Sequence, residues 1–253
     1  MADTTQGVTS STVRTRPKMS SWRQFKAILT KDIVMELRTK EMITSMGLYS
    51  LLVLVVYYLG LSQAGSGFDI ELIAAGLLWL AIIFTSMLGL NRSLVHEKDQ
   101  GCLDALLLSP IDRPVIFFGK AVGNLIFLLI VEAFVVPLFY FFFLTDAEVA
   151  GPVWMLLLSL LVGSIGIAGV GTMLATMSVN TKGKDFILAV LFVPLMFPLL
   201  YACVAASSAV FLGDVAFADG WVQAYWSALG LAAGYDAAML LAAFGLYEFI
   251  IGA

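Results

Sequence analysis

Long, nearly uninterrupted apolar runs alternate with short polar connections along most of the chain. Because a hydrocarbon core about 30 Å thick needs roughly 20 apolar residues in a helix, runs of this length predict membrane-spanning helices. Six such runs occur, at about residues 42–61, 72–91, 121–144, 153–179, 186–212 and 228–251. The pattern therefore predicts an all-α membrane protein, with a polar, flexible tail at residues 1–20 and one transmembrane domain over residues 21–253.

A narrower apolar pattern precedes the first run, over residues 21–40. Apolar side chains recur there every three or four positions, and the basic residues lie largely away from them. The stripe consists of Trp22, Phe25, Leu29, Ile33 and Leu37. This pattern predicts an amphipathic helix that lies on the membrane surface, where its basic residues meet anionic lipid. A plain soluble helix packed on a partner is the alternative.

The composition excludes several classes of protein. Apolar residues make up 60% of the chain and charged residues only 13%, about half of their usual share in a soluble domain. A soluble fold of this length cannot bury so much apolar surface, which excludes an ordinary cytosolic enzyme, a disordered chain and a disulfide scaffold. The cysteines Cys102 and Cys203 form no CxxC motif, and we find no metal-ligand cluster, catalytic triad or Walker A motif in the sequence.

The placement of the basic residues predicts the orientation in the membrane. All 14 lysines and arginines lie before the first run, around the connection between the second and third runs, or between the fourth and fifth runs. The charged residues in the other connections are all acidic, namely Asp69, Glu71, Asp146, Glu148, Asp214 and Asp219. Because connections rich in lysine and arginine stay in the cytoplasm, we expect both termini on that side.

The connection over residues 92–120 is the one sizeable segment predicted on the cytoplasmic side between two spans. Three leucines form a short apolar patch there, on an otherwise acidic turn of predicted helix. The patch consists of Leu103, Leu106 and Leu107, and it lies between Gly101 and Pro110. Leucines held outside the membrane need a surface that covers them. That surface is either a groove in a partner protein or the membrane and the chain's own helix ends.

Glu132 lies in the middle of the third predicted span. A carboxyl at this depth is costly, so we expect it to face other spans, in a functional role or as a structural group bonded to a neighbouring helix. Asp236 lies in the last span and is expected nearer its end, within reach of the interface. Trp79 is expected to pack inside the protein, and the segment 213–227 to dip into the membrane from outside without crossing it.

Small residues inside the fourth and sixth runs predict close packing between helices. The glycines concerned are Gly163, Gly166, Gly169, Gly171, Gly230 and Gly234. A dinucleotide-binding loop needs a strand before its glycines, whereas these glycines lie inside long apolar runs. His96 lies among charged residues in the polar connection, which favours a solvated side chain over a haem ligand.

Two segments resemble known sequence patterns. Residues 97–124, EKDQGCLDALLLSPIDRPVIFFGKAVGN, resemble the first cytoplasmic loop of ABC-2-type permeases. Residues 31–41, KDIVMELRTKE, are similar to the start of the haem exporter protein B (CcmB) family. The resemblance covers roughly residues 20–253 and implies an ABC-2 (type V exporter-like) permease fold. In that fold the helix over residues 21–40 is an elbow helix, and the segment after the fifth span is a re-entrant pair.

The resemblance also implies a function. It predicts the permease subunit of cytochrome c maturation system I, in the bacterial inner membrane, which works with haem and binds no nucleic acid. ATP would be hydrolysed by a separate CcmA-like subunit, so this chain would not itself be an enzyme. CcmC-like and CcmD-like proteins and a second copy of the chain are the other expected partners. The residues that would couple to the ATPase are Glu97, Gly101, Leu103, Leu106, Leu107 and Pro110.

ATP hydrolysis would then drive haem export or release of a haem-loaded chaperone. Three other functions remain compatible with the sequence. The chain could be an ABC-2 permease for a lipid or a drug, a secondary transporter that uses Glu132 as a proton relay, or a scaffold that anchors an assembly.

Overall fold

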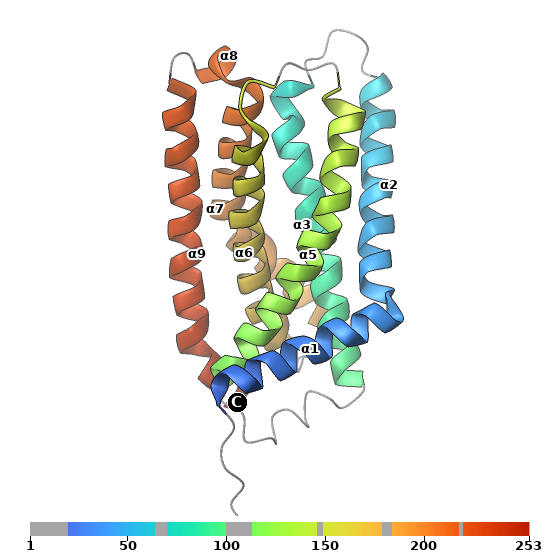
Figure 1. The fold of residues 1–253 in the computed structure, drawn as a ribbon, viewed down its shortest axis with the longest axis vertical. Helices are drawn as coiled ribbons and strands as arrows, with labels where there is room; N and C mark the ends of the chain where they lie inside the picture. The colour runs from blue at the N-terminus through green and yellow to red at the C-terminus, as the bar shows by residue number, and fades with distance from the viewer. Residues whose placement is uncertain are drawn as a thin grey trace, which may run out of the picture.

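The computed structural model describes residues 20–63, 70–99, 113–145, 149–178, 184–217 and 220–252. Within these ranges the regular structure is entirely helical, which confirms the all-α fold class. Long helices run side by side as a bundle, and the N-terminal helix crosses one end of it (Figure 1). The helices are α1 (Ser21–Thr39), α2 (Glu41–Gln63), α3 (Glu71–Asp99), α5 (Arg113–Phe143), α6 (Val153–Ser178), α7 (Lys184–Leu212), α8 (Asp214–Phe217) and α9 (Trp221–Gly252).

Six of these helices are long and apolar enough to cross a membrane, as the sequence predicts. The candidate spans are Glu41–Gln63, Glu71–Leu90, Pro114–Phe143, Val153–Met177, Val190–Leu212 and Trp221–Gly245. The third and sixth spans begin earlier than expected. Pro114 stands in the first turn of α5, where its missing backbone N–H is tolerated, and the apolar residues 115–118 already belong to the helix ahead of the expected start at residue 121.

The expected re-entrant segment over residues 213–227 is not a single element. Gly213 ends α7 with a φ of +50°, a conformation that glycine adopts without strain. The short helix α8 follows, and residues from Trp221 onward already belong to α9. The expectation is therefore wrong for the second half of the segment, because its aromatic residues extend the last span instead of forming a separate dip.

The turn between α1 and α2 is fixed by two hydrogen bonds. Lys40 has a left-handed backbone (φ 53°), and its N–H donates to the carbonyl of Glu36 at 2.6 Å. The carboxylate of Glu36 in turn accepts a hydrogen bond from the N–H of Ile43 at 2.9 Å. This caps one of the free N–H groups at the start of α2 and ties the end of the elbow helix α1 to that helix.

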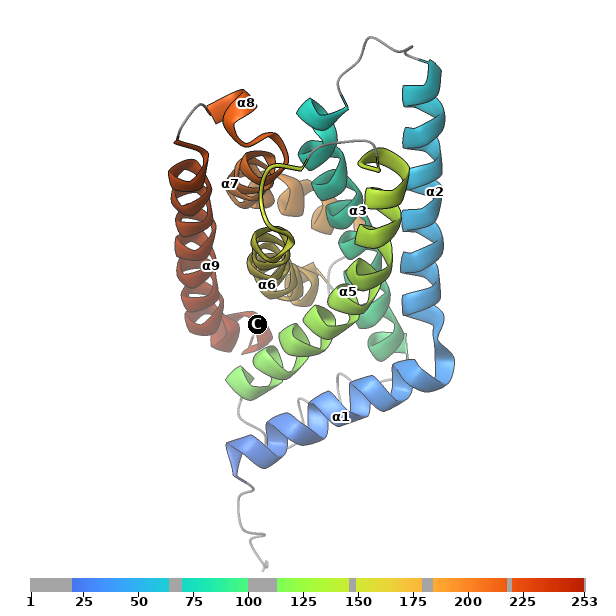
Figure 2. The same ribbon diagram turned by 45° about the horizontal axis from the view of Figure 1, so that its top comes forward.

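Helix α6 lies at the centre of the bundle and packs against α3, α5, α7 and α9. Figure 2 shows α6 with α7 and α9 on one side and α3 and α5 on the other. Its glycines allow this contact, because a Cβ atom at these positions would lie within 2.6 Å of a neighbouring side chain. The pairs are Gly163 with Trp79, Gly166 with Asp236, Gly169 with Leu240 and Gly171 with Leu90. The predicted close packing is confirmed for α6.

The same prediction is wrong for α9. A Cβ atom at Gly230 or Gly234 would have no heavy atom within 4 Å outside the helix backbone and the chain neighbours. These glycines lie on the side of α9 that the bundle leaves open. Only 22% of the α9 window is buried, against 61% in α6, so small residues predict contact only where the helix has neighbours on that side.

Candidate functional site

The elbow helix α1 is bound to the bundle at the beginning of α5. Ile28 lies against Gly119, where a Cβ atom would come within 2.9 Å of the Ile28 side chain. A small apolar cluster surrounds this contact and joins α1, α5, α6 and α9. Its buried members are Ile28, Ile116, Phe117, Ala121, Met173 and Ala243. The glycine at position 119 therefore determines how closely α1 approaches the bundle.

An ion pair reinforces this junction. The Nζ atom of Lys120 lies 3.2 Å from Oδ2 and 3.4 Å from Oδ1 of Asp32, and Lys31 lies 3.1 Å from Oδ1. Only 4% of the Lys120 side chain is exposed. The sequence does not predict this pair, because the two residues are 88 positions apart and no local pattern links them. The surrounding segments, KDIVMELRTKE and FFGK, stand out in the sequence only through their resemblance to family patterns.

The predicted stripe of the elbow helix coincides only in part with the side that packs on the bundle, since Leu29 lies against Gly123 of α5 and Ile33 packs on the core. Gln24, Ile28 and Glu36 are buried against the bundle. Of the stripe, Trp22 and Leu37 are exposed, and Phe25, Leu29 and Ile33 are half-buried. Trp22 stacks on Phe25, with their ring centroids 5.5 Å apart. The helix thus presents an apolar edge away from its protein contacts, as a helix that also touches lipid would.

The residues expected to couple to an ATPase lie almost entirely outside the described ranges. Glu97 lies in the last turns of α3, and its side chain is not described. The other five, Gly101, Leu103, Leu106, Leu107 and Pro110, belong to the segment 100–112, which the structure does not describe. The two helices that flank this segment, α3 and α5, place its ends near α1 (Figure 1).

Glu132 faces the inside of the bundle, as expected from the cost of a lipid-exposed carboxyl. Its side chain is 5% exposed, and its Oε1 accepts a hydrogen bond of 2.5 Å from the hydroxyl of Ser164. The bond joins α5 to α6 near the middle of both spans. The structural role weighed in the sequence analysis is therefore visible in the geometry.

Asp236 does not lie near an end of its span, so that expectation is wrong. The helix α9 begins at Trp221, which places Asp236 well inside the span Trp221–Gly245. Its side chain is 5% exposed and packs against Gly166 of α6. Its Oδ1 atom is buried without a hydrogen-bond partner. The misplacement followed from the expected start of the sixth span, because α9 continues through the polar and aromatic residues before it.

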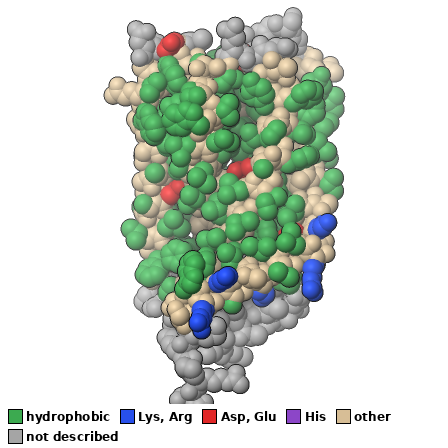
Figure 3. All heavy atoms as spheres, viewed as in Figure 1, with side chains coloured by type: hydrophobic (Ala, Val, Ile, Leu, Met, Phe, Trp, Pro, Cys, Tyr) green, Lys and Arg blue, Asp and Glu red, His purple; other side chains and the backbone are tan. Residues whose placement is uncertain are grey.

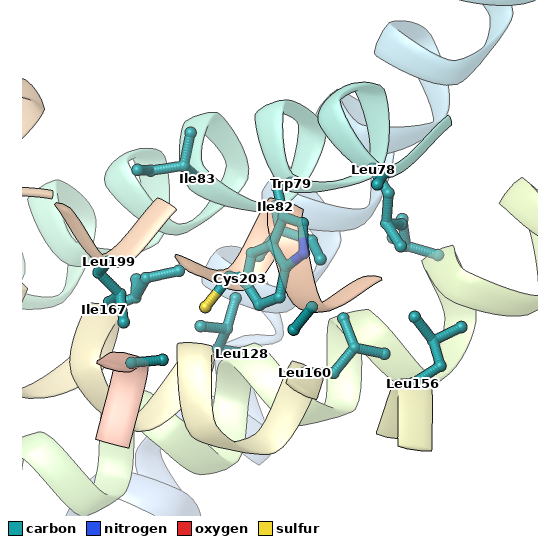
Figure 4. Packing of buried hydrophobic residues seen from close by; sticks show 14 of the residues in the cluster. Leu78, Trp79, Ile82, Ile83, Leu128, Leu156, Leu160, Ile167, Leu199 and Cys203 are labelled. Atoms are coloured by element: carbon teal, nitrogen blue, oxygen red, sulfur yellow. The ribbon is translucent and has the colours of Figure 1, made fainter. Parts of the chain in front are cut away.

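Trp79 is buried as expected, and it also makes a polar contact. Its indole N–H donates a hydrogen bond of 2.9 Å to the hydroxyl of Ser207, which joins α3 to α7. Figure 4 shows the Trp79 ring projecting from α3 into the core beside Cys203. A second bond of this kind, from Asn124 to the Thr172 hydroxyl at 2.9 Å, joins α5 to α6. Such bonds hold helices together where apolar packing alone gives little preference over lipid.

The described residues include no group of three or more His, Cys, Asp or Glu side chains that could hold a metal ion. What the structure brings together in the membrane is a set of single polar contacts between neighbouring helices. Near α1, in contrast, the structure brings opposite charges together at the base of α5. The same end of the bundle holds the contacts of α5 with both α1 and α3.

Comparison with known proteins identifies the family. The model of the family described as CcmB protein matches residues 23–246. A heme exporter protein B from Rhodobacter capsulatus is 27% identical over 177 residues, which cover 69% of this chain and 78% of the relative. The heme exporter protein B of Bradyrhizobium diazoefficiens is 28% identical over 141 residues, covering 56% of this chain and 62% of that protein. A protein of the same name from Pseudomonas aeruginosa is 26% identical over 131 residues, covering 52% of this chain and 57% of the relative. The chain is thus a multi-pass membrane protein that belongs to the CcmB protein family.

Proposed function

We propose that this protein is the membrane permease subunit of a haem-export complex in a bacterial inner membrane. The observation that carries the proposal is the family match over residues 23–246, on a fold with six candidate spans and an elbow helix. Three relatives bear the name heme exporter protein B. The chain would act with CcmC-like and CcmD-like proteins in cytochrome c maturation, by haem export or by release of a haem-loaded chaperone.

The energy for this work would come from ATP hydrolysed by a separate, CcmA-like subunit. The segment 100–112 would dock into that subunit through its three leucines. Burying three leucine side chains contributes on the order of 5 kcal/mol before the costs of association. Motion of the segment would reach the bundle directly, because its two ends continue into α3 and α5. The Asp32–Lys120 ion pair would hold α1 and the base of α5 together during that motion.

A double substitution tests the docking. Leu103→Ser combined with Leu107→Ser removes most of the apolar patch and leaves all six spans unchanged. We expect the protein to insert normally but to lose the ATPase subunit during purification in mild detergent, and with it the formation of c-type cytochromes in cells. Leu108→Ser is the matched control, since in the helix that the sequence predicts residue 108 would lie on the side opposite the patch. Normal co-purification and cytochrome formation in the double variant would contradict the proposal.

The same function requires that α1 lies on the cytoplasmic side. Basic residues are exposed along α1, and Figure 3 shows lysine and arginine side chains gathered at that end of the molecule. In a background with Cys102→Ser and Cys203→Ala, a membrane-impermeant thiol reagent should miss Thr5→Cys and label Asp146→Cys in cells whose inner membrane is intact. The reverse labelling would place the ATPase site on the wrong side and overturn the proposal.

A further inference from the structure

Two carboxyls flank α6 at the same depth of the bundle. Glu132 reaches α6 from α5 at Ser164, and Asp236 reaches it from α9 at Gly166, two positions further along the same helix. Figure 3 shows acidic side chains at mid-height on a face that is otherwise covered by hydrophobic side chains. The basic side chains on this face lie far from them, at the α1 end.

The two acids differ in what surrounds them. Glu132 accepts a hydrogen bond from the Ser164 hydroxyl, whereas no donor bonds to the buried Oδ1 atom of Asp236. The helices packed on α9 supply no cation to Asp236 within the described part of the chain. Gly166 of α6 faces its carboxyl, and the Cys203 thiol of α7 lies within electrostatic range of both Asp236 and Glu132. The adjacent tyrosine on α9, Tyr235, donates a hydrogen bond from its hydroxyl to the carbonyl of Leu195.

The position of Asp236 depends on the glycine that it faces. A Cβ atom at Gly166 would lie 2.0 Å from Oδ1 of Asp236 and 2.5 Å from the side chain of Leu199. The absence of a side chain at Gly166 lets α9 approach α6 so closely that the carboxyl is enclosed between them. Only 5% of Asp236 is exposed, which leaves little surface through which water could solvate a charged oxygen.

An ionised carboxylate with no counter-ion and no donor is strongly disfavoured in this environment, and the neutral acid is the form that tolerates it. We propose that Asp236 is a proton-binding site, occupied by a proton while α6 and α9 are packed as in this structure. Release requires water to reach the site. The O–H bond of the acid then breaks, the proton passes to water, and the carboxylate remains. This goes beyond the proposed permease function, because it assigns a second ligand to the membrane domain whatever its principal substrate is.

The proposal links proton occupancy to helix packing. Unfolding exposes Asp236 to water, where a carboxyl is ionised at neutral pH. The folded state then binds more protons than the unfolded state, so the stability that this site contributes falls as the pH rises through the neutral range. Asp236→Asn keeps the size and a neutral polar group, and it abolishes this dependence. Glu132→Gln leaves the dependence due to Asp236 in place.

Infrared spectroscopy of the full chain in lipid nanodiscs tests the proposal directly. Aspartate labelled with carbon-13 at its side-chain carboxyl separates Asp236 from the glutamates. At neutral pH we expect a carbonyl-stretching band of a protonated acid that shifts with the label and in heavy water. The band should be absent from Asp236→Asn and present in Glu132→Gln. The labelled parent protein gives the answer even where the asparagine variant fails to fold.

A parent protein that lacks the label-shifted band at neutral pH would overturn the proposal, and so would a band that persists in a folded Asp236→Asn variant. The pH dependence of the melting temperature gives a second measurement. The parent and Glu132→Gln should both lose melting temperature between mildly acidic and mildly alkaline pH, and Asp236→Asn should lose less. Equal slopes in all three proteins would show that Asp236 holds no proton in the packed state. Neither result depends on the ATPase or on haem, so failure of this proposal is distinguishable from failure of the proposed function.

Discussion

The end of the bundle near α1 and the middle of the bundle both enclose ionisable side chains, but these side chains have different partners. At the α1 end, Lys120 is almost fully buried and is paired with Asp32 at 3.2 Å. At mid-height, Glu132 has only a hydroxyl as partner, and Asp236 has none for its Oδ1 atom. The α1 end can keep buried Lys120 charged because Asp32 supplies the opposite charge. In the middle of the bundle each of the two acids lies at a contact between helices, Glu132 at Ser164 and Asp236 at Gly166.

Reversing one charge at the α1 end should change stability more than any other substitution that tests this comparison. Asp32→Lys replaces the anion between Lys31 and buried Lys120 by a further cation, and we expect a loss of about 3 kcal/mol in the free energy of unfolding. Combining it with Lys120→Asp restores an opposite pair and should recover most of the loss. The measurement is denaturant unfolding of the detergent-solubilised protein. Lys26→Asp, on the exposed side of α1, is the control and should change little. If the swapped pair is no more stable than Asp32→Lys alone, the ion pair does not hold the elbow.

Filling the space beside Asp236 tests the middle of the bundle. Gly166→Ala puts a methyl group where Oδ1 of Asp236 and the Leu199 side chain already lie, and it should cost about 1 to 3 kcal/mol through overpacking. Gly230→Ala is the matched control, because a Cβ atom there meets nothing within 4 Å. We expect it to leave stability unchanged or slightly improved. Equal melting temperatures for the two variants would show that α6 and α9 are not packed through Gly166.

Removing the Ser164 hydroxyl, which donates a hydrogen bond to Glu132, should have the smallest effect on stability. Ser164→Ala leaves the buried carboxyl without its partner and should cost about 0.5 to 1.5 kcal/mol. Ser227→Ala is the control, since that hydroxyl is exposed and bonds only to the carbonyl of Ala224 in its own helix. Thermal unfolding followed by tryptophan fluorescence compares the two. A destabilisation by Ser164→Ala as large as that of charge reversal would mean that the middle of the bundle holds a charge after all.

The sequence by itself determined the number of spans, their approximate limits and the existence of the elbow helix. The physical reason is local, because lipid cannot satisfy backbone N–H and C=O groups and every long apolar run must form its own helical hydrogen bonds. The close packing at the glycines of α6 could also be predicted, since small residues in a span indicate close helix contacts. Glu132 could be assigned to the inside of the bundle on the cost of its charge alone.

Only the tertiary structure decided which residues meet. Asp32 and Lys120 come from helices far apart in the chain, and Asp236 was misplaced because the true start of α9 depends on how its aromatic residues continue the helix. Gly166 and Gly230 look alike in sequence, yet one meets a neighbouring helix and the other meets open space. Each apolar helix offers several similar faces, and a residue's partner follows from which face its neighbours cover. That choice is made by packing across the whole bundle and leaves no local pattern in the chain.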